Sequence, residues 1–93
     1  MKNFMDLVYE RGISVSELAD WCMISRQLVY KYICGDVDPN KISYINIVHL
    51  ASYIGVSENE VYNSICESYK SKRIWCDTLK KWVLPEEIIE KVR

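Results

Sequence analysis

The stretch from residue 16 to residue 35, SELADWCMISRQLVYKYICG, contains the side chains best suited to forming specific hydrogen bonds. Four of them would lie on the outer side of a helix: Arg26, Gln27, Tyr30 and Lys31. All four are hydrogen-bond donors, and Gln27 and Tyr30 also accept. Catalysis has no comparable set, because His49 is the single histidine and no nucleophile pattern surrounds it. We therefore expect recognition, and we do not expect an enzyme.

The cysteines do not have the spacing of a metal site. The chain has four, Cys22, Cys34, Cys66 and Cys76, and none belongs to a C-x-x-C pair. A zinc site needs four converging ligands, which closely spaced pairs usually supply. We therefore expect reduced thiols, buried or half-buried, with neither a metal nor a cofactor.

Three helices are expected to position the polar stretch. The first covers residues 3–11 and stops at Gly12. The second covers 15–22 after the capping-box pattern SVSE, and the third covers 26–34 between a Ser25 cap and Gly35. Their inward residues are expected to be Leu18, Ala19, Cys22, Val29, Tyr32 and Ile33. No proline or glycine separates the second helix from the third, so a tight turn at CMIS joins them.

Two more helices complete a bundle over residues 1–69. DVDPNK is a turn, because Pro39 bars helix continuation. A fourth helix is expected over 44–54, with Ser43 as its cap, and a fifth near 58–70 after SENE. The broad apolar face of the fourth helix would comprise Tyr44, Ile47, Val48, Leu50, Ala51 and Ile54. Five short helices with their own start and stop signals predict an all-α bundle.

Residues 70–93 form a basic, tryptophan-containing extension. KRIWC and KKWVL are β-prone runs separated by DTL, which favours a hairpin over the alternative of a helix throughout. Pro85 would open a last short helix containing Ile88, Ile89 and Val92. The extension is expected to be a solvated surface, a second phosphate contact or part of a dimer. Trp21 either packs under it, against Trp75 or Trp82, or is an exposed anchor for a partner.

Charge is distributed unevenly along the chain. Residues 1–69 hold five Lys/Arg and nine Asp/Glu, a net of −4, whereas residues 70–93 hold seven and four, a net of +3. Since phosphate neutralisation supplies non-specific affinity for DNA, the first segment is poorly suited to it. The apolar runs are too short for a membrane span, and acidic residues interrupt the apolar start. A cytoplasmic location is therefore expected.

Residues 4–66 resemble the XRE family, the Cro and lambda-repressor type of helix-turn-helix domain. The resemblance rests on several features in order: Gly12 before a capped helix, Leu18-Ala19, the Ile24-Ser25 turn, Gly35, Pro39, and Leu50-Ala51 ahead of Gly55-Val56-Ser57. It implies a five-helix lambda-repressor-like bundle whose third helix enters the major groove. It also implies a homodimer on a palindromic operator, acting as a transcriptional regulator, most often a phage, plasmid or bacterial repressor.

The resemblance carries site roles to particular positions. The reading residues would be Ser25, Arg26, Gln27, Tyr30 and Lys31, with Lys41 as an added cation. Four residues depart from the family pattern: Val15, Met23, Asp36 and Asp38. Val15 replaces a glutamine that opens the second helix, Met23 replaces the glycine of the turn, and the two aspartates would lie near phosphates. The alternative is a protein-binding module on the same scaffold, an antitoxin or phage-encoded inhibitor.

Overall fold

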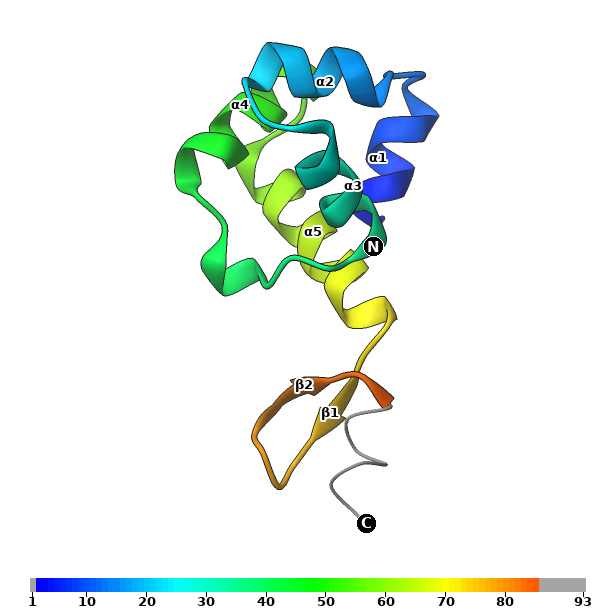
Figure 1. Cartoon of the computed structure of the whole chain (residues 1–93), viewed down its shortest axis with the longest axis vertical. Helices are drawn as coiled ribbons and strands as arrows, with labels where there is room; N and C mark the ends of the chain where they lie inside the picture. The colour runs from blue at the N-terminus through cyan, green and yellow to red at the C-terminus, as the bar shows by residue number, and fades with distance from the viewer. Residues whose placement is uncertain (1, 86–93) are drawn as a thin grey trace.

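The structure is a computed structural model that describes residues 2–85. This part of the chain forms five α-helices, one short 3-10 helix and one hairpin. The elements are α1 (Phe4–Glu10), α2 (Val15–Cys22), α3 (Arg26–Cys34), η1 (Pro39–Lys41), α4 (Tyr44–Ile54), α5 (Glu58–Ser71), β1 (Ile74–Cys76) and β2 (Lys81–Val83). Figure 1 shows the helices packed together and the hairpin extending beyond the end of α5. The helical bundle and the hairpin are confirmed, and the alternative of a helix through the extension is wrong. The short helix expected after Pro85 lies outside the described residues.

Serine side chains cap the N-termini of three of the helices, as expected. Ser14, Ser25 and Ser57 accept hydrogen bonds from the backbone N–H groups of Glu17, Leu28 and Glu60 at 3.3, 3.1 and 3.1 Å. The complete capping box is instead at α1, between Asn3 and Asp6, a position where none was predicted. Ser43 makes no side-chain cap, so that expectation is wrong.

Gly35 ends α3 at a point where two helices nearly touch. Its φ is +75°, and a Cβ there would lie 2.1 Å from the carbonyl oxygen of Ser68 on α5. The left-handed backbone favours glycine, and the Ser68 carbonyl leaves no space for a Cβ. This contact brings the end of α3 directly against α5.

The core is built around α5, which packs against α1, α3 and α4. Its buried apolar members include Phe4, Val8, Leu18, Ala19, Val29, Tyr32, Leu50, Val61 and Ile65. The Tyr32 and Phe4 rings meet edge to face, with centroids 5.8 Å apart. The backbone N–H of Phe4 also donates to the buried Ser68 hydroxyl at 2.9 Å, which ties the chain start to α5. Burial of this apolar set is the main stabilising contribution.

Several expected core residues lie closer to the surface. Tyr44 is 67% exposed, and its hydroxyl donates to the Glu58 carboxylate at 2.6 Å, so it joins the starts of α4 and α5. Val48 and Ile33 are half-buried. All four cysteines are free thiols, but Cys34 is exposed, contrary to expectation. Cys22 is buried as expected, and this burial raises the pKa of its thiol to about 11.

The hairpin pairs Trp75 with Trp82 across its two strands, and their ring centroids are 5.8 Å apart. Residues before it connect it to the bundle. Arg73 Nη1 donates to the carbonyl oxygens of Gly35 at 2.6 Å and Tyr69 at 3.0 Å, with its guanidinium carbon 3.8 Å from the Tyr69 ring centroid. Part of the positive charge of the extension is therefore used within the fold.

Candidate nucleic-acid interface

The turn between α2 and α3 adopts the left-handed conformation at Met23. Its φ is 58° and its ψ is 41°, and its side chain is 87% exposed. The Ile24 N–H donates to the Ala19 carbonyl at 3.0 Å, which closes the end of α2. A non-glycine residue in this region costs about 1–2 kcal/mol. Met23 thus adopts a left-handed backbone conformation that glycine adopts at a lower energetic cost.

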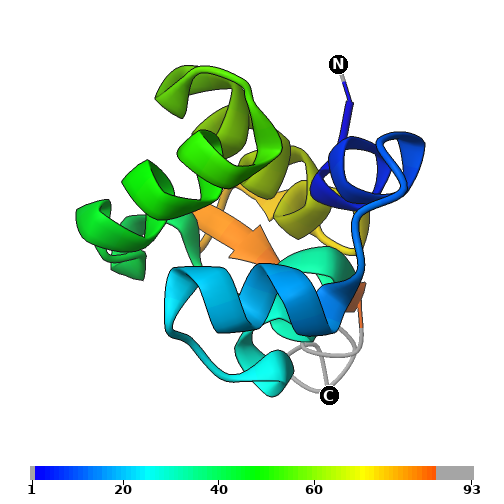
Figure 2. The same ribbon diagram turned by 90° about the horizontal axis from the view of Figure 1, so that it is seen from above.

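This turn leaves the outer side of α3 uncovered. Ser25, Arg26, Gln27, Tyr30 and Lys31 are all exposed, whereas Val29 and Tyr32 point into the core. Figure 2 shows α2 and α3 together on one side of the bundle, away from the start of α1. The structure therefore brings five of the six expected site residues onto one accessible helix face.

The five exposed residues are not equally available. Ser25 uses its hydroxyl to cap α3, and Arg26 Nη1 lies 3.5 Å from the Ser16 hydroxyl oxygen, at the limit of a hydrogen bond. Among residues 2–85, three of the five have no side-chain hydrogen bond or ion pair: Gln27, Tyr30 and Lys31. These three side chains are therefore the most available to an incoming ligand, followed by Arg26.

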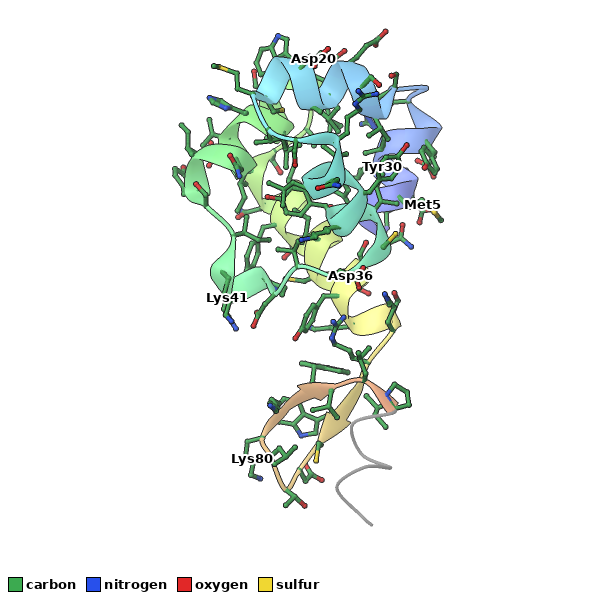
Figure 3. The ribbon with its side chains drawn as sticks, viewed as in Figure 1. Met5, Asp20, Tyr30, Asp36, Lys41 and Lys80 are labelled. Carbon is green, nitrogen blue, oxygen red and sulfur yellow. The ribbon has the colours of Figure 1, made fainter. Side chains whose placement is uncertain are left out.

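Lys41, the sixth expected residue, stands apart from α3. It is exposed on η1, a short 3-10 helix that the sequence indicated only as a turn. Figure 3 shows it on the other side of the bundle from Tyr30. The structure thus does not bring Lys41 into the α3 group.

The carboxylates of both aspartates after α3 make polar contacts within the fold. The Asp36 carboxylate pairs with Lys72 Nζ at 2.6 Å. The Asp38 carboxylate accepts from the Asn40 backbone N–H at 2.9 Å and caps η1. An ion pair with Lys72 offsets the negative charge of Asp36, so its repulsion of an approaching phosphate is reduced.

Trp21 packs on α4, so the alternative in which it packs under the extension is wrong. Its ring centroid lies 5.5 Å from that of Tyr53 and 6.2 Å from that of His49, and 50% of its surface is exposed. His49 Nδ1 is buried beside it without a hydrogen-bond partner among the described residues. Trp75 and Trp82 pack on each other instead.

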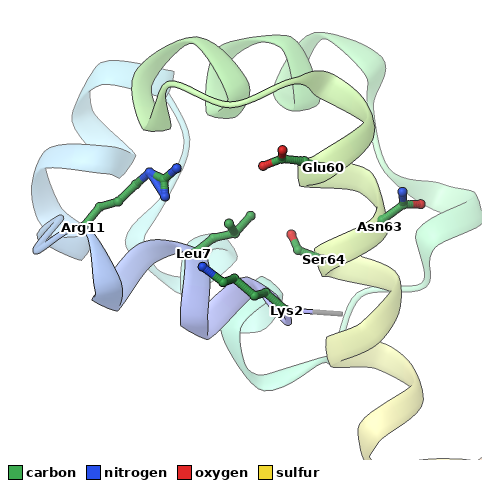
Figure 4. A pocket seen from close by; sticks show the side chains of 6 residues that line it. All are labelled: Lys2, Leu7, Arg11, Glu60, Asn63 and Ser64. Carbon is green, nitrogen blue, oxygen red and sulfur yellow. The ribbon is translucent and has the colours of Figure 1, made fainter.

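A hollow between α1 and α5 has no reactive set of side chains. It has a volume of about 420 Å³ and is lined by Lys2, Leu7, Arg11, Glu60, Asn63 and Ser64 (Figure 4). Lys2 pairs with Glu10 at 2.6 Å, and the Ser64 hydroxyl donates to the Val61 carbonyl at 2.7 Å. Over the described ranges, no three His, Cys, Asp or Glu residues gather as metal ligands would.

Of the helices within residues 2–85, none is long and apolar enough to cross a bilayer.

Comparisons with known proteins gave no match: no family model fits the chain, and no curated protein or solved structure is significantly similar to it. The assignment of a function therefore depends on the residues and geometry described above.

Proposed function

We propose that this chain is a sequence-specific, double-stranded-DNA-binding transcriptional regulator of the XRE helix-turn-helix type. In this proposal α2 and α3 form the helix-turn-helix, and α3 enters the major groove. The observation that carries the proposal is the exposed face of α3, where Arg26, Gln27 and Lys31 lie beside a tight left-handed turn. A helix presented in this way matches the width of the major groove.

Each side chain on this face suits a particular contact. The Gln27 amide can donate to and accept from adenine, and the Arg26 guanidinium suits guanine or a phosphate. Lys31, a flexible point charge, suits a phosphate, and Tyr30 suits a thymine methyl group or the backbone. A good bidentate base contact contributes about 1–3 kcal/mol of discrimination between bases. Sequence preference is thus assigned to Gln27 and Arg26, and positioning to Lys31.

The proposed active form is a cytoplasmic homodimer on a palindromic operator, acting as a phage, plasmid or bacterial repressor. Two half-sites about one helical turn apart bind two copies of α3, so their contributions combine in one binding event. Dimerisation matters here because residues 1–69 carry a net charge of −4. A few local contacts, made twice in a symmetric dimer, would supply the affinity for DNA that a broadly basic surface would otherwise supply.

Selection of bound duplexes from a random DNA pool tests the proposal. We expect enrichment of a palindrome. On that sequence, Gln27→Ala should relax the preference at one base position in each half-site. Lys31→Ala should weaken binding to all sequences and lower the salt slope by about one per protomer. Lys2→Ala, which removes an equal charge just before α1, is the matched control and should leave binding unchanged. Failure to enrich any sequence, or equal effects of Lys2→Ala and Lys31→Ala, would contradict the proposal.

A protein-binding module, such as an antitoxin or phage-encoded inhibitor, is the second candidate. The observation that favours it is Trp21, a half-exposed tryptophan supported by Tyr53 and His49 on a largely acidic segment. Tryptophan is enriched among the residues that dominate interface energies. Pull-downs from a host lysate with wild type and Trp21→Ala separate the candidates. A stoichiometric protein partner that Trp21→Ala loses would favour this module, whereas DNA without such a partner would favour the regulator.

A further inference from the structure

A second cleft lies between η1, the C-terminal half of α5 and the hairpin, away from the outer face of α3. Its volume is about 470 Å³, within the size range of small-molecule sites. Cations line it from two directions: Lys70 and Arg73 from the end of α5, and Lys80 and Lys81 from the hairpin. Asp38 is its one acidic lining residue, so the lining carries a net charge of +3 (four cations minus one carboxylate). A cleft of this charge selects an anionic ligand.

The four cations differ in the contacts that they make within residues 2–85. Arg73 is committed to the Gly35 and Tyr69 carbonyls, and Lys70 Nζ lies 5.5 Å from the centroid of the Trp82 ring. Within residues 2–85, Lys80 and Lys81 have neither a side-chain hydrogen bond nor an ion pair. Lys80 also has a φ of 55°, a conformation that lysine rarely adopts. Figure 3 shows Lys80 at the loop of the hairpin.

The remaining walls of the cleft are largely aromatic. Trp75 and Trp82 are directly opposed in the hairpin, and both line the cleft, together with Tyr62 and Tyr69 of α5. Trp75 is 48% exposed, and its indole N–H donates to Asp77 Oδ1 at 2.8 Å, which orients the ring. An oriented, half-exposed indole beside the Lys80 and Lys81 ammonium groups suits a planar ring that carries a phosphate, because aromatic faces stack on such rings.

From this arrangement we propose that the cleft binds a nucleotide, with its base against Trp75 and its phosphate at Lys80 and Lys81. The nucleotide can be free in solution or one unit of a single strand, since both present the same ring and phosphate. None of these residues belongs to the α3 face, so the site is independent of the proposed operator contacts.

Tryptophan fluorescence tests the proposal on the full chain. In a Trp21→Phe background, the emission comes from Trp75 and Trp82 alone. We expect saturable quenching by AMP, by an oligonucleotide of about 12 deoxythymidines, or by both. Lys80→Asn/Lys81→Gln should weaken this binding about tenfold or more, because charge-assisted contacts are lost. Asparagine is used at residue 80 because it tolerates a positive φ.

The controls separate this site from other causes. Lys2→Gln, just before α1, should not change the affinity, and neither should Gln27→Ala on α3. Titration calorimetry on the same samples measures binding without the tryptophans as reporters. Quenching by AMP identifies a free nucleotide, whereas quenching by the oligonucleotide alone identifies a strand. The proposal is overturned if inorganic phosphate binds as tightly as AMP. It is also overturned if no probe binds by either method, or if the double variant binds as wild type does.

Discussion

At the scale of single residues, Gly35 tolerates substitution least, because backbone conformation and packing both act on it. Its left-handed φ disfavours any side chain, and the Ser68 carbonyl oxygen occupies the place where a Cβ would go. Gly12 and Gly55 have similar φ values, +65° and +86°, but nothing lies within 4 Å of a Cβ built on either. The three glycines therefore allow the two costs to be measured separately.

Gly35→Ala should lower the free energy of unfolding by about 3 kcal/mol, since α3 and α5 must move apart. Gly12→Ala and Gly55→Ala carry the backbone cost alone and should lower it by about 1 kcal/mol. Urea denaturation followed by far-ultraviolet circular dichroism measures all three values. Equal losses at the three positions would show that the close approach of α3 to α5 does not contribute.

At the scale of elements, helix starts and stops were predictable because they depend on neighbours along the chain. Ser25 caps α3 with the N–H three residues later, and Gly35 stops it. Contacts between distant residues left no such local signal. The Asp36–Lys72 pair joins residues 36 positions apart. Trp21 packs against Tyr53 on α4 and not against a tryptophan of the extension. The polar face of α3 was therefore predictable, and the aromatic, basic cleft was not.

The attachment of the hairpin to the bundle depends mainly on Arg73. Its guanidinium donates to the carbonyl at the end of α3 and stacks on Tyr69, whereas its neighbour Lys72 makes one exposed ion pair with Asp36. Hydrogen bonds from a charged group contribute about 1.5–3 kcal/mol, and exposed ion pairs about 0–1 kcal/mol. Replacing Arg73 is thus expected to weaken the attachment of the hairpin much more than replacing Lys72.

Arg73→Ala should make the backbone amides of residues 74–83 exchange about tenfold faster with deuterated solvent, because the hairpin separates more often from the bundle. Lys72→Ala, the matched control, should change exchange less than about fivefold. Hydrogen–deuterium exchange with mass spectrometry measures both. If Lys72→Ala accelerates exchange as much as Arg73→Ala does, the ion pair holds the hairpin in place.

At the scale of the whole molecule, the position of charges matters more than their sum. The chain has a net charge of −1, but residues 70–93 carry +3, and Lys72 brings part of that charge to the end of α3. A second exposed ion pair has the same 2.6 Å separation but joins Lys2, just before α1, to Glu10 at the end of that helix. The two pairs distinguish a local contact with DNA from a general electrostatic attraction.

Asp36→Asn and Glu10→Gln each raise the net charge by one and release one lysine. If DNA lies along α3, Asp36→Asn should strengthen operator binding and steepen the dependence of log K on log salt by about 0.9 per protomer. Glu10→Gln should change neither, and both variants should keep their free energy of unfolding within about 1 kcal/mol. Fluorescence anisotropy with a labelled operator over a range of salt concentrations measures the slopes. Equal steepening by both variants would show that DNA responds to the total charge and would remove the basis for placing it along α3.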